Sequence, residues 1–203
     1  MEIVSLRRAA ARLIGKKLLQ PGDSLSCRLT DQALAASLRI GADGGVGADH
    51  QLLQPDAAAP LNSHEGIYGR RPDVGAVVFS QQPWATALIK APRAMPGLFD
   101  EQVRHLGSTI AKLDVSTLAT GNNGFLLDDA VLCLGVTLER AVYNVELLEK
   151  CATAYLLATT TGTRPTCVPW VIRLIAGRRL RRDERYAADC HRQGRIPVFK
   201  SAY

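Results

Sequence analysis

The sequence predicts a single layered α/β domain, and three observations support this prediction. Stretches with helical periodicity alternate with short apolar runs that are typical of strands. The chain has 203 residues and a mass of 21.9 kDa, which fits one domain with little room for a second. Its composition, with 47% hydrophobic and 22% charged residues, is close to the average for globular proteins.

The first part of the chain alternates helix and strand signals. An apolar stripe predicts an amphipathic helix over 3–19, which ends at Pro21-Gly22. Short strands are expected over 24–29 and 33–40, and a turn-rich surface stretch over 41–58. Further helices are expected over 61–70, 83–90, 101–112 and 138–157 and after Pro169. Further strands are expected over 74–79, 115–119 and 124–127, and the end of the chain is expected to be extended.

Several classes of protein are excluded. No uninterrupted apolar run approaches the ~18 residues that a membrane-spanning helix needs. Residues 1–17 carry basic side chains every few positions and lack the apolar centre of a signal peptide. The five cysteines form no Cys-x-x-Cys pair, which predicts free thiols rather than a disulfide framework. We therefore expect a cytoplasmic protein without membrane contact.

The positive charge of the chain is concentrated at its end. Residues 1–163 hold 15 basic and 16 acidic side chains, a net charge of −1, whereas residues 164–203 hold 10 and 3, a net charge of +7. Such a block can contact phosphate, form the solvated face of a helix, or pair with acidic surface on a neighbouring subunit. No aromatic side chains for base stacking interleave the arginines of 178–185, so nucleic acid is not the expected partner.

Residues 66–86, GIYGRRPDVGAVVFSQQPWAT, resemble the class II aldolase/adducin superfamily. Its members carry the pattern Ile-Tyr-x-x-Arg-Pro-Asp-Val-Gly-Ala-Val-Val, followed by His-Thr-His-Ser-Pro-Tyr-Ala-Thr. About twenty positions match without a gap, but this chain continues as Phe79-Ser80-Gln81-Gln82-Pro83-Trp84.

Weaker matches flank this block in the expected order. Residues 22–28 resemble the family's Gly-Asn-x-Ser-x-Arg segment, 121–127 its Asn-His-Gly segment, and 138–157 its closing helix. The resemblance implies a three-layer α/β/α domain around a mixed central β-sheet over 1–163. The basic helix and extended tail of 164–203 would then pack on the same domain or on a neighbouring subunit.

The resemblance also implies a metal site whose residues are replaced in this chain. In the family's enzymes three histidines hold a divalent metal, usually zinc, and a glutamate acts as acid or base. The histidine positions fall on Phe79, Gln81 and Asn123, and the glutamate position falls on Pro60. Phe79 cannot bind metal, side-chain amides are poor zinc ligands, and Pro60 has no titratable group that could act as acid or base. We therefore predict no zinc, and a cleft at Phe79, Gln81 and Asn123 that Trp84 and Pro60 also line.

Few other polar residues can act in this cleft. The weak candidates for proton transfer are Glu65, His64 and Tyr68, and a packing role is favoured for His64. Ser24, Ser26 and Arg28 match part of the family's phosphate-binding segment and are candidate anion-binding residues, although a surface position is favoured for Arg28.

Three hypotheses of function remain open. The leading one is a non-catalytic homologue with a degenerate metal site, which binds a small polar ligand or acts as a scaffolding or regulatory module. The alternative is an aldolase- or decarboxylase-like lyase, acting on a small sugar phosphate or hydroxy acid with a non-standard or absent metal site. The third is an anion or nucleic-acid binder that uses the arginines of 178–185. The resemblance implies a homo-oligomer, with a tetramer expected.

Overall fold

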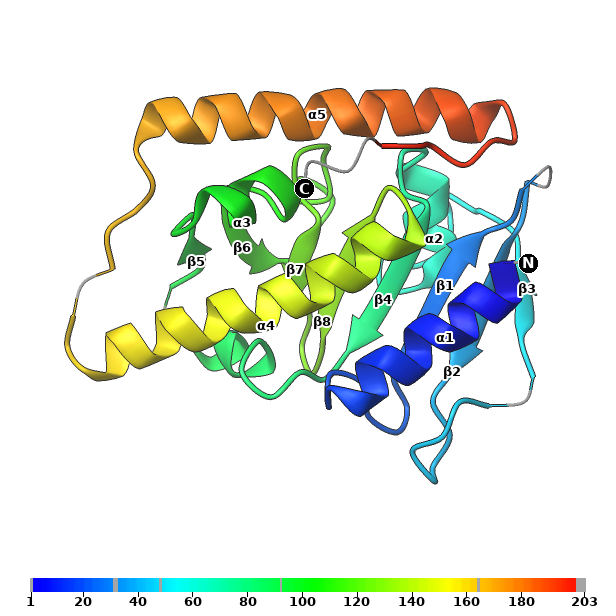
Figure 1. Cartoon of the computed structure of the whole chain (residues 1–203), viewed down its shortest axis with the longest axis horizontal. Helices are drawn as coiled ribbons and strands as arrows, with labels where there is room; N and C mark the ends of the chain where they lie inside the picture. Colours follow the sequence, from blue (N-terminus) through cyan, green and yellow to red (C-terminus); the bar gives the residue numbers. More distant parts are fainter. Residues whose placement is uncertain (1, 31–32, 48, 92, 164, 200–203) are drawn as a thin grey trace.

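One mixed β-sheet with helices on both faces forms the body of the protein (Figure 1). The computed structural model describes residues 2–30, 33–47, 49–91, 93–163 and 165–199. The helices are α1 (Glu2–Gly15), α2 (His64–Arg70), α3 (Asp100–His105), α4 (Leu138–Thr160), α5 (Trp170–Arg192) and the 3-10 helix η1 (Thr86–Lys90). The strands are β1 (Ser24–Arg28), β2 (Ala35–Arg39), β3 (Gln51–Leu53), β4 (Ala76–Ser80), β5 (Met95–Pro96), β6 (Thr109–Lys112), β7 (Gly124–Leu126) and β8 (Val131–Gly135).

The sheet has the strand order β3-β2-β1-β4-β8-β7-β6-β5. Its pairs are antiparallel except for β6 with β7, which are parallel, so the sheet is mixed. Strand β4 lies between β1 and β8 and is apolar on both faces, since Val78 joins one core cluster and Val77 the other. This alternation is the period of two that a strand imposes on its side chains.

The two core clusters define the layers. Helices α1 and α4 pack on one face of the sheet, where Leu13, Val78 and Leu148 are fully buried. Helix α2 packs on the other face through Ile67 and Tyr68. The α/β fold around a mixed central sheet is therefore confirmed. No helix in the described part of the chain is long and apolar enough to span a bilayer.

Some predicted elements are wrong, and local contacts explain why. The helix expected over 101–112 ends at His105, because Gly107 has a φ of +107° and the chain turns there into strand β6. The strand expected over 115–119 is a turn, in which the Asp114 carboxylate accepts hydrogen bonds from the backbone of Ser116 and Thr117. Strands β3, β5, β6 and β8 were not predicted as strands. Asp128 and Asp129 lie in the turn between β7 and β8.

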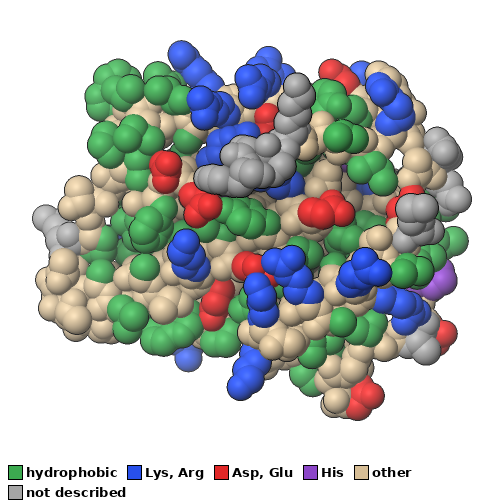
Figure 2. All heavy atoms as spheres, viewed as in Figure 1, with side chains coloured by type: hydrophobic (Ala, Val, Ile, Leu, Met, Phe, Trp, Pro, Cys, Tyr) green, Lys and Arg blue, Asp and Glu red, His purple; other side chains and the backbone are tan. Residues whose placement is uncertain are grey.

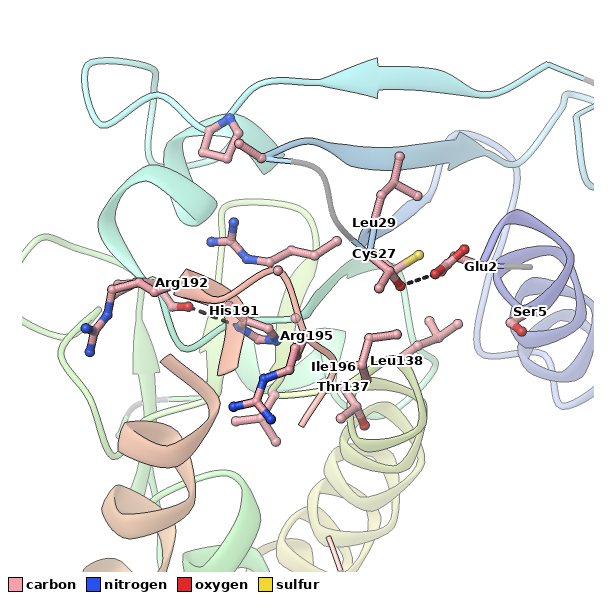
Figure 3. Close-up of a pocket in the computed structure, with 18 of the residues that line it drawn as sticks. Glu2, Ser5, Cys27, Leu29, Thr137, Leu138, His191, Arg192, Arg195 and Ile196 are labelled. Atoms are coloured by element: carbon pink, nitrogen blue, oxygen red, sulfur yellow. Dashed lines mark hydrogen bonds between the residues drawn. The ribbon is translucent and has the colours of Figure 1, made fainter. Parts of the chain in front are cut away.

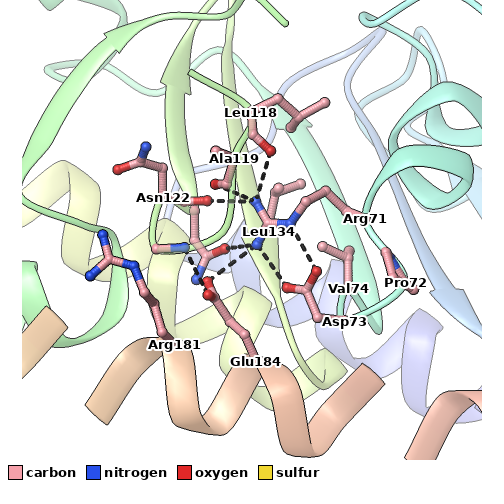
Figure 4. A network of polar contacts seen from close by, with 12 residues as sticks. Arg71, Pro72, Asp73, Val74, Leu118, Ala119, Asn122, Leu134, Arg181 and Glu184 are labelled. Carbon is pink, nitrogen blue, oxygen red and sulfur yellow. Dashed lines mark hydrogen bonds and ion pairs between the residues drawn. The ribbon is translucent and has the colours of Figure 1, made fainter. Parts of the chain in front are cut away.

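Arg71 is the centre of a buried ionic network that joins α5 to the body (Figure 4). It is only 2% exposed, at the end of α2. Its Nε and Nη2 atoms donate to the two carboxylate oxygens of Asp73 over 2.8 and 2.7 Å. Nη2 also donates to Asn123 Oδ1 (3.0 Å) and to Glu184 Oε1 of α5 (3.2 Å). Nη1 donates to backbone carbonyls of the loop before β7, the shortest contact being 2.9 Å to Asn122. All the donor nitrogens of this guanidinium therefore have acceptors.

The basic C-terminal helix docks on the body through its acidic residues. Glu184 is fully buried, and its Oε2 accepts a 2.7 Å hydrogen bond from the backbone N–H of Gly121. Asp183 pairs with Arg104 of α3 at 2.5 Å. The arginines of 178–185 are exposed, whereas the first turns of α5 carry exposed apolar side chains; Figure 2 shows these two groups in succession along the helix. The exposed apolar residues there are Trp170, Val171, Ile172, Leu174 and Ile175.

The protonation of Glu184 predicts a specific dependence of stability on pH. Burial raises the pKa of Glu184 from 4.5 to about 7, against the lowering effect of Arg71 and with a further raising effect of Asp73. Because this folded-state pKa lies above the unfolded value, the contribution of Glu184 to stability is full below pH 4.5 and is lost as the pH rises to about 7.

Glu184→Gln cannot ionise at this position. As the pH is raised from 5 to 8, we therefore expect its free energy of unfolding to rise relative to that of the wild type by on the order of 2 kcal/mol. Urea unfolding of both proteins at the two pH values measures this difference. Asp189→Asn, at an exposed carboxylate of the same helix, is the matched control and should show no such gain. Equal pH dependence of Glu184→Gln and the wild type would contradict the assignment.

Candidate functional site

A cleft of about 1010 Å³ lies where the first residues of β1 meet the ends of β2, β4 and β7. Phe79 and Gln81, two of the predicted cleft residues, line it together with Ser24, His64 and Glu65. Charged residues that the sequence analysis did not assign to the cleft complete the lining: Asp23, Arg39, Asp49, Lys112, Asp128 and Asp129.

His64 is the centre of a hydrogen-bonded chain along one wall of this cleft. Its Nε2 lies 2.9 Å from the hydroxyl of Ser24, and its Nδ1 lies 2.7 Å from the hydroxyl of Ser26. Ser26 in turn lies 2.9 Å from the hydroxyl of Tyr68. The Phe79 ring packs edge-on against the His64 imidazole, with ring centroids 4.8 Å apart. Ser24 and Ser26 point the same way because alternate residues of a strand share a face.

The buried hydroxyl of Tyr68 determines which group donates in each of these hydrogen bonds. In the described part of the protein, Ser26 provides the hydrogen-bond partner of the Tyr68 hydroxyl. A phenol that accepted from Ser26 would leave its own O–H unpaired in the core, which is costly. Tyr68 therefore donates to Ser26, Ser26 donates to Nδ1 of His64, and the Nε2–H of His64 donates to Ser24. The Ser24 hydroxyl, at the wall of the cleft, keeps its proton to donate to a ligand.

His64 is consequently neutral and already fully bonded. Burial, and secondarily the charge of Arg39, lower the pKa of His64 from 6.5 to about 3. The imidazole donates to Ser24 and does not accept its proton, so the pair is not a nucleophile with its base. The ring contacts Phe79 edge-on and orients the Ser24 hydroxyl through Nε2, and the packing role expected for His64 stays a prediction.

Asp23 lies at the base of the cleft and holds its backbone in place. Its Oδ2 accepts hydrogen bonds from the backbone N–H groups of Gln20 (2.8 Å) and Gln81 (3.0 Å). Burial raises the pKa of Asp23 despite these hydrogen bonds, and the charge of Asp129 acts in the same direction. The turn between β7 and β8 thus brings the carboxylate of Asp129 close enough to Asp23 to raise its pKa, and both residues line the cleft.

Six predicted site residues do not line this cleft: Ser26 and Tyr68 lie behind its wall, hydrogen-bonded to one another, and the other four lie elsewhere. Asn123 is buried at the other end of β7, where it accepts from Arg71 and its Nδ2 donates to the His105 carbonyl over 3.1 Å. Trp84 is 40% exposed, and its backbone N–H donates to Glu149 of α4. Pro60 is exposed beside the cleft, and its carbonyl accepts from the Ser63 hydroxyl. Arg28 lies at the far end of β1, where its Nε donates to the Val74 carbonyl over 2.7 Å.

Zinc does not fit the residues of this cleft. Among the described residues, no group of three or more His, Cys, Asp or Glu side chains is arranged to hold a metal ion. The Phe79 ring offers no donor atom, and both ring nitrogens of His64 are engaged by serine hydroxyls. We therefore derive no chemical step through a metal.

The chain of hydrogen bonds predicts the tautomer of His64. Ring nitrogen NMR should show Nδ1 without a proton and Nε2 with one, unchanged from pH 8 to pH 5, because protonation occurs only near pH 3. Tyr68→Phe removes the donor that fixes the direction, so it should shift the ring toward a mixture of tautomers. A titration midpoint near 6.5, or the opposite tautomer in the wild type, would contradict this assignment.

Comparison with solved structures finds the same architecture. An L-fuculose 1-phosphate aldolase aligns with a TM-score of 0.65 and 18% identity, over 86% of this chain and 93% of that one. A second, from Glaciozyma antarctica, aligns with a TM-score of 0.66 and 16% identity, over 93% and 86%. A third, from Thermus thermophilus, aligns with a TM-score of 0.61 and 18% identity, over 80% and 97%. No curated protein matches the chain.

At these identities the structural likeness shows the fold alone. The family is shown by the sequence, because the profile described as Class II Aldolase and Adducin N-terminal domain matches residues 16–156. This match covers more than half of the chain and includes β1, β4 and all the residues that line the cleft. The resemblance noted from residues 66–86 is thereby confirmed: the chain belongs to the class II aldolase and adducin family.

Proposed function

We propose that this protein is a non-catalytic member of the family that binds a small polyhydroxylated ligand in the cleft without a metal. The observation that carries the proposal is the pairing of Phe79 with His64. An aromatic ring stands at a position where the family's enzymes are expected to hold a metal ligand. The neighbouring imidazole is neutral and engaged by two serines.

The lining of the cleft suits hydroxyl groups. Ser24 presents a hydroxyl donor, Gln81 an exposed amide, and Asp128 and Asp129 exposed carboxylate acceptors. The half-buried ring of Phe79 supplies an apolar surface of the kind that small-molecule sites combine with a few polar groups. A sugar or polyol offers matching donors, acceptors and an apolar ring face.

The charge of the cleft argues against a phosphate ester. Five carboxylates and two cationic side chains line it, and Arg28, the expected anion-binding residue, lies elsewhere. This excess of negative charge favours a neutral or cationic ligand and repels a phosphate. The acceptor-rich lining is therefore consistent with free sugars and amino sugars.

A lyase remains the second candidate, and Glu65 is the residue that favours it. Its side chain belongs to the cleft lining, at the first turn of α2. The other two proton-transfer candidates are less suited, because His64 has no unengaged ring nitrogen and the Tyr68 hydroxyl is buried. Burial also raises the pKa of Tyr68 far above its ordinary value.

The exposed apolar side chains at the start of α5 support the proposal that copies of this chain associate. A scaffolding or regulatory role would use such an assembly. The tetramer and the cytoplasmic location stay predictions.

Calorimetric titration in the presence of EDTA tests the proposal. We expect L-fucose and D-glucosamine to bind at least tenfold more tightly than L-fuculose 1-phosphate, because carboxylates predominate in the cleft. Asp128→Asn with Asp129→Asn should narrow this difference. Phe79→Ala should weaken sugar binding at least fivefold, whereas Phe99→Ala, at an exposed phenylalanine outside the cleft, should not.

Binding that requires added zinc would contradict a metal-free site. If the wild type consumes L-fuculose 1-phosphate and Glu65→Gln abolishes this consumption, the protein is a lyase and the proposed binding function is wrong.

A further inference from the structure

A second cavity, of about 590 Å³, lies at the opposite end of β1 from the cleft (Figure 3). Helix α1, the end of β1, the start of α4 and the end of α5 enclose it. It shares no lining residue with the cleft. Its volume is within the range of small-molecule sites.

Arg28 supplies a guanidinium to this cavity that is only partly engaged. Its Nε donates to the Val74 carbonyl over 2.7 Å and its Nη2 donates to the Tyr68 carbonyl over 3.1 Å. The guanidinium lies over the Tyr68 ring, 4.8 Å from its centroid. These contacts hold the guanidinium along its Nε–Nη2 edge. At its Nη1–Nη2 edge, the described residues supply neither a hydrogen-bond acceptor nor an ion-pair partner. Two parallel N–H groups at such an edge match the two oxygens of a carboxylate.

No ion pair among the described residues neutralises Arg28; Glu139, which also lines the cavity, is exposed to solvent and forms none with it. Glu2 is bonded to the Thr30 hydroxyl, Arg192 pairs with Asp189, and the side chain of Arg195 bonds the Gln193 amide oxygen. His191 donates from Nδ1 to the Pro72 carbonyl over 3.1 Å. Burial lowers the pKa of His191, and the neighbouring charge of Arg28 acts in the same direction. Burial likewise lowers the pKa of Arg28, as expected of a guanidinium that has lost water without gaining a counter-ion.

The rest of the wall is largely apolar. Side chains from five separate elements or loops contribute to it: Leu29, Pro55, Val136, Leu138 and Ile196. Figure 3 shows Leu29, Leu138 and Ile196 around the same space as His191 and Arg195. This apolar part of the wall, beside the free Nη1–Nη2 edge of Arg28, fits a ligand with an apolar body and an anionic head.

We infer that this cavity binds a small organic acid, whose carboxylate accepts two hydrogen bonds from the Nη1–Nη2 edge of Arg28 and whose apolar part lies against Leu29, Leu138 and Ile196. The site is independent of the cleft. It would make the protein a sensor or carrier of a carboxylate, whatever the cleft binds.

Hexanoate, hexanol and inorganic phosphate are the probes that test this inference. Calorimetry on the full chain should give a dissociation constant of about 1 mM or tighter for hexanoate, and at least tenfold weaker binding for hexanol, which lacks the carboxylate. Phosphate, which lacks the apolar part, should also bind at least tenfold more weakly. Arg28→Gln should weaken hexanoate binding at least tenfold, whereas Arg39→Gln, at an exposed arginine of the cleft, should leave it unchanged.

Two further measurements do not depend on the folding of Arg28→Gln. Ser5→Trp, which keeps Arg28 and places a large side chain at the α1 wall of the cavity, should abolish hexanoate binding. In wild-type protein, hexanoate should shift the side-chain nitrogen resonances of Arg28, and hexanol should not. Equal affinity for hexanoate and hexanol, or unmoved Arg28 resonances at saturation, would overturn the inference. Absence of saturable hexanoate binding below 10 mM would overturn it as well.

Discussion

The buried guanidinium of Arg71 is the interaction on which the arrangement of the chain depends. It joins the end of α2, the loop before β7 and helix α5, three segments far apart in the sequence. A buried charge is tolerated only when its partners are complete, and here Asp73, Glu184, Asn123 and backbone carbonyls complete them. Loss of one partner would leave the others charged or unpaired in the core. The same network explains why a strongly basic helix docks through an acidic residue.

Strand β1 connects the two sites of the molecule. Ser24, Ser26 and Arg28 share one face of the strand, yet they serve different spaces. Ser24 and Ser26 bond His64 beside the cleft, while Arg28, roughly 13 Å along the strand from Ser24, reaches the second cavity. The segment 22–28, which resembles the family's phosphate-binding segment, therefore borders two separate spaces, with Ser24 in the cleft and Arg28 in the second cavity. The cleft is left with a hydroxyl donor and an excess of carboxylates, which is the basis for proposing an uncharged or cationic ligand.

The sequence was most informative where local pattern and burial coincide. The apolar run 74–79 predicted β4, and the helical spacing from residue 138 predicted α4. The partners of Phe79 could not be predicted, because His64 and Ser24 come from separate elements that only the sheet brings together. Asn123 was assigned to the cleft, but Arg71 holds it elsewhere through a contact between residues 52 positions apart. The run VLCLG of β8 was a usable signal, since with 124–127 it flanks Asp128-Asp129 as a hairpin and would have placed these carboxylates at the cleft.

Hydrogen exchange of the backbone amides in α5 measures the role of Arg71 most directly. The account predicts that amides around Glu184, from 180 to 190, exchange as slowly as those of α4, and that those of 172–176 exchange much faster. In Arg71→Ala, protection should be lost from 180–190 and retained in α4. Uniformly fast exchange along α5 in the wild type, or unchanged protection of 180–190 in Arg71→Ala, would contradict the central place of this network.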